Sequence, residues 1–109
     1  MRTLPEADWK VLRELSKVAY ERFCERSLGE VSVVLADAAR TKGNQFDEVF
    51  RLMKDRDDDL RSIFGNDSRS TAFIRMLALR SRSLLTDEEF ARFSAETREA
   101  VDSVVGVIG

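Results

Sequence analysis

Residues 5–39 read PEADWKVLRELSKVAYERFCERSLGEVSVVLADAA, and this stretch decides the fold. Its apolar side chains recur at intervals of three or four, with one turn skipped at Ser27, and this spacing places them on one face of an α-helix. Pro5 followed by Glu6 and Asp8 suits a helix N-terminus, where proline costs no hydrogen bond and negative charge meets the helix dipole. The stretch therefore predicts one long amphipathic helix with these inward positions: Leu12, Leu15, Ala19, Phe23, Val31, Val34 and Ala38.

The length of this helix conflicts with a compact domain. A helix of about 35 residues spans about 52 Å, whereas a compact chain of 109 residues has a radius of gyration of only about 13 Å. Gly29 is the candidate for a break, because glycine costs about 1 kcal/mol in a helix interior. Without a break the helix outruns its own domain. Its last part, residues 31–39, is apolar nearly all round and then needs cover on more than one side.

A second copy of the chain is the simplest cover for this segment. We therefore predict self-association as a homodimer through the N-terminal helix, with these binding residues: Val31, Val33, Val34, Leu35 and Ala38. Trp9 is a candidate hot spot for a second protein partner, since tryptophan is enriched at the centres of interfaces. The alternative for Trp9 is an anchor that packs the first turn against the C-terminal valines.

The next part of the chain predicts a second helix. Gly43 is expected to close the first helix in the left-handed conformation, and Asn44 to cap a helix over residues 45–64. One proline and five glycines leave little room for the turns of an all-β fold. The apolar positions of the second helix are expected to face the core: Phe46, Val49, Phe50, Met53, Leu60 and Ile63.

Three further helices complete the expected fold. A helix is expected over residues 69–83, and its residues 72–79 form the most apolar window of the chain, which places that helix at the centre. Thr86 with Glu89 three residues later is a capping-box pattern that opens a short helix. A last helix is expected over residues 95–105, followed by a fraying tail at residues 106–109. The sequence thus predicts a single all-α domain over residues 1–109, a bundle of about five helices.

The composition argues against most enzyme classes. The chain has no histidine and a single cysteine, Cys24. Histidine is the usual general base near neutral pH and a common metal ligand, and one cysteine cannot build a zinc cluster or an internal disulfide. No glycine-rich phosphate loop is present. We therefore expect no cofactor, and the sequence favours a non-enzymatic protein.

A run of aspartates at residues 55 and 57–59 carries the one remaining enzyme hypothesis. Asp55 and Asp59 share a helical face at a spacing of four residues, so a hard divalent ion could bridge them with a third ligand from elsewhere. This is the weaker alternative of a carboxylate-metal hydrolase. The simpler interpretation is a solvated run of charge.

Four arginines without an intervening acid suggest a second alternative, a regulator that binds nucleic acid. They lie on the expected third helix, and arginine forks fit phosphate oxygens: Arg69, Arg75, Arg80 and Arg82. Against this reading, the neighbouring segments supply acids for internal pairing, and the formal net charge is −2. Nucleic acid is therefore the less favoured partner.

Several short motifs together resemble a family of small, uncharacterised bacterial helical proteins. They are Asp8-Trp9-Lys10, Glu21-Arg22-Phe23-Cys24, Arg56-Asp57 with Leu60, Leu84-Leu85-Thr86-Asp87-Glu88-Glu89 with Phe93, and Thr97-Arg98. The resemblance implies one all-α domain in a bacterial cytoplasm, and it implies no function and no site residue. No apolar run approaches the roughly 20 residues that span a bilayer, and the N-terminus lacks a signal-peptide pattern. We expect a cytoplasmic protein without a membrane partner.

Overall fold

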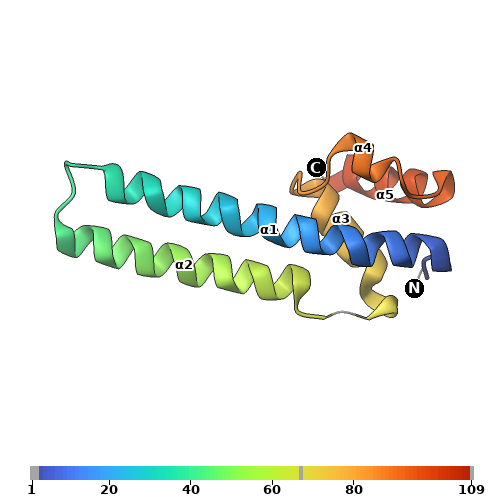
Figure 1. The fold of residues 1–109 in the computed structure, drawn as a ribbon, viewed down its shortest axis with the longest axis horizontal. Coiled ribbons are helices and arrows are strands. Elements are labelled where there is room, and N and C mark those ends of the chain that lie inside the picture. The colour runs from blue at the N-terminus through green and yellow to red at the C-terminus, as the bar shows by residue number, and fades with distance from the viewer. Residues whose placement is uncertain (1–2, 67, 109) are drawn as a thin grey trace.

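The computed structural model describes residues 3–66 and 68–108, and of residues 107 and 108 the backbone only. No strand occurs within these ranges, so the prediction of an all-α fold with a long N-terminal helix is confirmed (Figure 1). The elements are α1 (Glu6–Ala36), α2 (Lys42–Phe64), the 3₁₀ helix η1 (Arg69–Thr71), α3 (Ala72–Ser81), α4 (Asp87–Phe90) and α5 (Ala95–Ile108).

Helix α1 runs unbroken over 31 residues. Its first turn begins as predicted, with the Trp9 amide donating to the Pro5 carbonyl at 3.0 Å. Gly29 lies within the helix with open space beside it, so the alternative of a break there is wrong. The molecule measures 52 × 25 × 23 Å, and its radius of gyration is 16.6 Å, against about 13 Å for a compact chain of this length. The helix does outrun its domain.

The core occupies only one end of the molecule. Helices α1 and α2 form an antiparallel hairpin, and α3, α4 and α5 lie at the end away from its turn (Figure 1). On α1 the core residues stop at Phe23. We call this end the body, and residues 24–60 of the hairpin the arm. The core cluster consists of Leu4, Leu12, Leu15, Ala19, Phe23, Ile63, Ala72, Met76, Leu79, Leu84, Leu85, Phe90, Phe93 and Val101.

The start of α2 differs from the expectation. The Thr41 hydroxyl accepts from the Asn44 amide at 3.1 Å, so Thr41 caps the helix in place of Asn44. Gly43 lies in the first turn of α2, and no described glycine has a positive φ. The prediction that Gly43 closes α1 is therefore wrong. A threonine cap three residues earlier than expected makes a left-handed glycine unnecessary.

The apolar side of α2 is also not the core surface that its spacing suggested. Ile63 is buried, but Phe46, Phe50 and Met53 are exposed. The prediction that they face the core is wrong. The physical reason is that the arm contains only two helices, and the contact with α1 covers one side of α2 alone.

The segment predicted as one helix over residues 69–83 divides into η1 and α3, and it ends at Ser81. Ser83 follows with a left-handed φ of 57°, which stops any continuation of the helix. Its central position is confirmed, because Met76 and Leu79 are fully buried.

The C-terminal helices begin as predicted, but α4 ends at Phe90 instead of near Phe93, and α5 extends beyond residue 105. The capping box is present: Glu89 N donates to the Thr86 hydroxyl at 3.1 Å and Thr86 N to the Glu89 carboxylate at 2.9 Å. Helix α5 continues to Ile108, so the fraying expected from residue 106 to residue 108 is not found. Gly109 lies outside the described residues. The single glycine at residue 106 costs only about 1 kcal/mol, which a packed helix tolerates.

A buried carboxylate ties the start of α1 to the start of α5. Asp8 is 3% exposed. It accepts from the Ser94 amide at 2.9 Å, from the Ser94 hydroxyl at 2.7 Å and from the Thr97 hydroxyl at 2.6 Å. Burial raises the pKa of Asp8, but the hydrogen bonds from Thr97 and Ser94 outweigh it and hold the pKa below its usual value. One acidic side chain thus serves the N-termini of two helices.

A bidentate ion pair joins α1 to α4. The Arg22 guanidinium donates to both oxygens of Glu89 at 2.5 and 2.8 Å, and to the Leu84 carbonyl at 2.9 Å. The hydrogen bond from Arg22, opposed by partial burial, lowers the pKa of Glu89 to about 2. The charged form of Glu89 therefore stabilises the fold.

Replacing Glu89 with Gln should flatten the acid dependence of stability. The pKa of Glu89 falls from 4.5 to about 2 on folding, so its contribution is present above pH 4.5 and is lost as the pH falls through about 2. We expect the unfolding free energy of the wild type to drop by about 2 kcal/mol more than that of Glu89→Gln between pH 6 and pH 2. Urea denaturation over this pH range measures it. The control is Glu88→Gln, at an exposed neighbour; identical pH profiles for all three proteins would contradict the assignment.

Candidate protein-interaction surface

Two adjoining grooves run along one side of the arm. The outer groove, of about 570 Å³, lies between Leu35 of α1 and a row of α2 side chains that includes Phe46 and Phe50. The inner groove, of about 270 Å³, lies between α1 at Leu28 and α2 at Met53. Because Met53 lines both, the two grooves form one continuous surface. We call its five large apolar residues, Leu28, Leu35, Phe46, Phe50 and Met53, the arm face.

The arm face is unusually open for side chains of this kind. Relative exposure is 58% for Leu28 and for Leu35, and 74% for Phe46, 65% for Phe50 and 38% for Met53. Single exposed apolar residues are common on protein surfaces, but a contiguous patch marks a binding surface. The arm face is a contiguous patch, because its members share two joined grooves.

A group of polar contacts lies along the arm next to the body. Arg56 of α2, which also lines the inner groove, donates to Glu30 of α1 at 2.8 and 3.0 Å, which lowers the pKa of Glu30. Arg26 donates to the carbonyls of Arg82 and Ser83 at 2.9 and 2.5 Å. Leu28 is two residues from both Arg26 and Glu30, which is about 200° around a helix. Arg26 and Glu30 therefore point away from Leu28.

A buried glutamine holds the end of α1 against α2. Gln45 is 5% exposed. Its amide nitrogen lies 3.3 Å from the carbonyls of Val34 and Leu35 and 3.2 Å from that of Asp37. The last carbonyls of a helix have no partner within the helix, so Gln45 supplies the donor that they lack. The sequence alone did not predict this role for Gln45. The available signal was an uncharged polar side chain one turn into the second helix.

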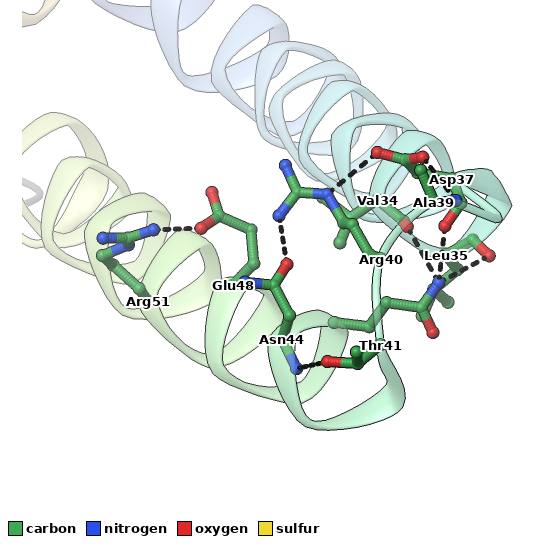
Figure 2. A network of polar contacts seen from close by, with 10 residues as sticks. Val34, Leu35, Asp37, Ala39, Arg40, Thr41, Asn44, Glu48 and Arg51 are labelled. Atoms are coloured by element: carbon green, nitrogen blue, oxygen red, sulfur yellow. Dashed lines mark hydrogen bonds and ion pairs between the residues drawn. The ribbon is translucent and has the colours of Figure 1, made fainter.

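Exposed polar side chains complete the network at the turn (Figure 2). Arg40 donates to Asp37 at 3.1 Å and to Asn44 at 2.8 Å, which links the turn to the first turn of α2. Arg51 pairs with Glu48 on the next turn. The end of the arm is thus fixed by directional contacts in addition to apolar packing.

The five residues predicted for self-association separate in the structure. Val34 is buried against the rest of the arm, and Val31 is half-buried. Ala38 lies exposed in the turn, and Val33 is 72% exposed. Val33 is two residues from Leu35, so it points away from the grooves. Only Leu35 of the five joins the arm face.

Helix α2 supplies most of the arm face, and sequence reasoning had assigned those residues to the core. A periodic apolar stripe has the same spacing whether it meets its own chain or a partner. Nothing in the local pattern around Phe46 and Phe50 separates the two cases. The prediction that Phe46 and Phe50 face the core is wrong because the arm has only two helices, so no third helix covers this side of α2.

Trp9 lies far from the arm face, in the first turns of α1. Its partly buried ring packs against the body core. The Arg13 guanidinium carbon lies 6.0 Å from the ring centroid. This position agrees with an anchor within the chain. The role of a hot spot for a second protein stays a prediction.

The four arginines of the nucleic-acid alternative all have partners within the chain. Three of them reach acidic side chains: Glu6 for Arg69 (2.6 Å), Asp87 for Arg80 (2.9 Å) and Asp59 for Arg82 (3.8 Å). Arg75 is 7% exposed and donates to the carbonyls of Ile63, Phe64 and Asn66 at 2.8–3.3 Å. The structure does not gather them into one open basic surface.

The aspartate run is placed along the arm without a third carboxylate. Asp59 pairs with Arg56 at 3.3 Å and lies 3.8 Å from Arg82, while Asp55 is exposed. Over residues 3–66 and 68–108, no three His, Cys, Asp or Glu side chains are placed to share a metal ion. The third ligand that the hydrolase hypothesis requires is therefore not supplied by the described part of the chain.

Comparisons with protein-family models, with curated proteins and with solved structures return no match for this chain. The resemblance to a bacterial helical family stays a prediction. No described helix combines the length and the apolar character needed to cross a bilayer. The candidate surface is therefore supported by its geometry and by the exposure of its residues.

Replacing Gln45 with Ala should loosen the arm. The carbonyls of Leu35 and Asp37 lose the Gln45 donor, and the Val34 carbonyl keeps only the Asp37 amide; a partly buried acceptor without a partner is costly. We expect the unfolding free energy to fall by about 2 kcal/mol, measured by urea denaturation, and the amides around residues 34–45 to exchange faster. Asp47→Ala, at an exposed position two residues away, is the control. Equal losses for both variants would show that Gln45 does not hold the arm end.

Proposed function

We propose that this protein is a non-enzymatic helical module that binds protein through the arm face, and that its first partner is a second copy of itself. The observation that carries the proposal is the arm face, a contiguous apolar surface built by two helices and left uncovered by its own chain. The rigid turn supports it, since a preorganised surface loses less entropy on binding. A bacterial cytoplasmic setting is part of the proposal.

The energetic balance favours reversible association. Complete burial of an exposed Leu, Phe or Met side chain gains about 1.5–3 kcal/mol. The arm faces of two copies carry ten such side chains, each partly exposed, so the gross gain is on the order of 12 kcal/mol. Association costs about 4–15 kcal/mol in lost motion, and a preorganised surface favours the lower end of this range. A cost of about 4 kcal/mol leaves a net of about −8 kcal/mol, which corresponds to a dissociation constant of about 1 μM.

The two alternatives gain no comparable support. The nucleic-acid hypothesis needs arginines available to phosphate, and each of the four has an acceptor within the chain. The hydrolase hypothesis needs a third ligand beside Asp55 and Asp59. We therefore propose neither, and protein binding is the function that the geometry favours.

A pair of matched substitutions tests the arm face. Leu35→Asp should weaken self-association by at least about tenfold, because the interface would bury a carboxylate without a partner. Val33→Asp makes the same chemical change two residues away, on the side that points away from the grooves, and should leave association unchanged. Sedimentation velocity over a concentration series measures both, with far-UV circular dichroism as the check on folding. Equal effects of the two variants would contradict the proposal, as would a wild type that stays monomeric up to hundreds of micromolar.

A further inference from the structure

We propose that the two copies associate antiparallel, about a two-fold axis that crosses the middle of the arm. On α1 the axis lies at the level between residues 31 and 32, and on α2 at the level between residues 49 and 50. This inference rests on the proposed function, and it names the geometry of the partner at the same surface. In this arrangement α1 lies over the partner's α1 and α2 over the partner's α2. The turn of each arm points toward the body of the other copy.

The first evidence is the placement of the arm-face residues along the two helices. Leu35 and Phe46 line the outer groove together, and Leu28 and Met53 line the inner groove together. The midpoint between residues 28 and 35 falls between 31 and 32, and the midpoint between residues 46 and 53 falls between 49 and 50. The α1 pair Leu28 and Leu35 and the α2 pair Phe46 and Met53 therefore share one midpoint level along the arm.

A two-fold contact requires this kind of self-complementarity. When a residue i of one copy touches residue j of the other, j also touches i. Rotation about the proposed axis places Leu28 opposite the partner's Leu35, and Phe46 opposite the partner's Met53. Phe50 lies beside the axis, where the two copies of one side chain meet. Every large apolar residue of the arm face thus meets another one.

The second evidence is charge. Lys42 lines the outer groove at the turn end, and Asp57 lines the inner groove at the body end. Arg56 also lines the inner groove, but it is paired with Glu30 and Asp59 of its own chain. The midpoint of Lys42 and Asp57 again falls between residues 49 and 50. The antiparallel arrangement sets each Lys42 beside the partner's Asp57, so two ion pairs close the two ends of the interface. A parallel arrangement would bring like charges together at both ends, which disfavours it.

Each of the two charged groups has one side-chain contact within its own chain: an exposed one for Asp57 and a partly buried one for Lys42. Asp57 accepts from Arg61 at 3.0 Å, and the Lys42 ammonium lies 3.4 Å from the Gln45 side-chain oxygen. Neither contact is bidentate, and Lys42 and Asp57 are exposed. They can therefore turn toward a partner at little cost.

The size of the strip fits a small, reversible interface. Lys42 and Asp57 are about 22 Å apart along α2, and two helices side by side are about 20 Å wide. Each copy then presents a projected area of about 440 Å², or about 880 Å² over two copies, which is the size of weak, transient protein–protein contacts. The partner's turn reaches the level of residue 58 of α2, short of the body.

A charge exchange tests the geometry. Lys42→Glu alone faces the partner's Asp57, and Asp57→Lys alone faces the partner's Lys42, so each variant should self-associate at least about tenfold more weakly than the wild type. An equimolar mixture of the two variants pairs Glu with Lys at one end of the interface and Lys with Asp at the other. We expect the mixture to associate within about threefold of the wild type. Sedimentation velocity, with one variant carrying a fluorescent label, measures the three cases, and circular dichroism checks folding.

The outcomes separate this inference from the proposed function. A wild type that dimerises, with variants that are not rescued by mixing, overturns the antiparallel geometry and leaves self-association standing. In the parallel arrangement position 42 faces position 42 of the partner, so Lys42→Glu would associate more tightly with the wild type than the wild type associates with itself. That result also overturns the antiparallel axis. A wild type that remains monomeric overturns both. Weaker association of each variant alone, together with rescue by their mixture, supports the axis as placed.

Discussion

Helix α1 is longer than the core that it helps to build, and the other features of the molecule follow from this constraint. The apolar core covers α1 only as far as Phe23. Beyond that point α2 is the one helix packed along it, and a single neighbouring helix can shield one side of another. The arm therefore has two open sides. One is occupied by the ion pairs of Arg56 and Glu30 and by the contacts of Arg26 with the body. The other is the arm face.

The arm keeps its shape without a core because its ends are fixed by polar contacts. Gln45 satisfies the last carbonyls of α1, and Thr41 caps α2. These contacts determine the register between the two helices, and the register brings Leu35 to the level of Phe46. A hairpin without them could slide, since apolar packing alone is weakly directional. The geometry of the candidate surface thus depends on a buried amide that is not itself part of that surface.

Much of the fold could be predicted from spacing and capping chemistry, because these signals are local. The start of α1, the capping box of α4 and the central position of α3 follow from residues within a few positions of one another. The roles of Asp8 and Gln45 could not be predicted in this way, since Asp8 meets Ser94 and Thr97 across almost the whole chain. The candidate site was predicted in part. Surplus apolar surface at the end of α1 pointed to Leu35, but Phe46 and Phe50 were placed in the core, because periodicity reports a face and not what covers it.

The central claim is that a second copy covers the arm face, and hydroxyl-radical footprinting at increasing protein concentration tests it most directly. The account predicts that oxidation of Leu28, Leu35, Phe46 and Phe50 falls as the concentration rises through the association range. Oxidation of Val33 and Ile74, which are also exposed and lie elsewhere, should stay constant. Equal reactivity of the arm face at all concentrations, or protection that follows Val33 and Ile74 instead, would contradict the account.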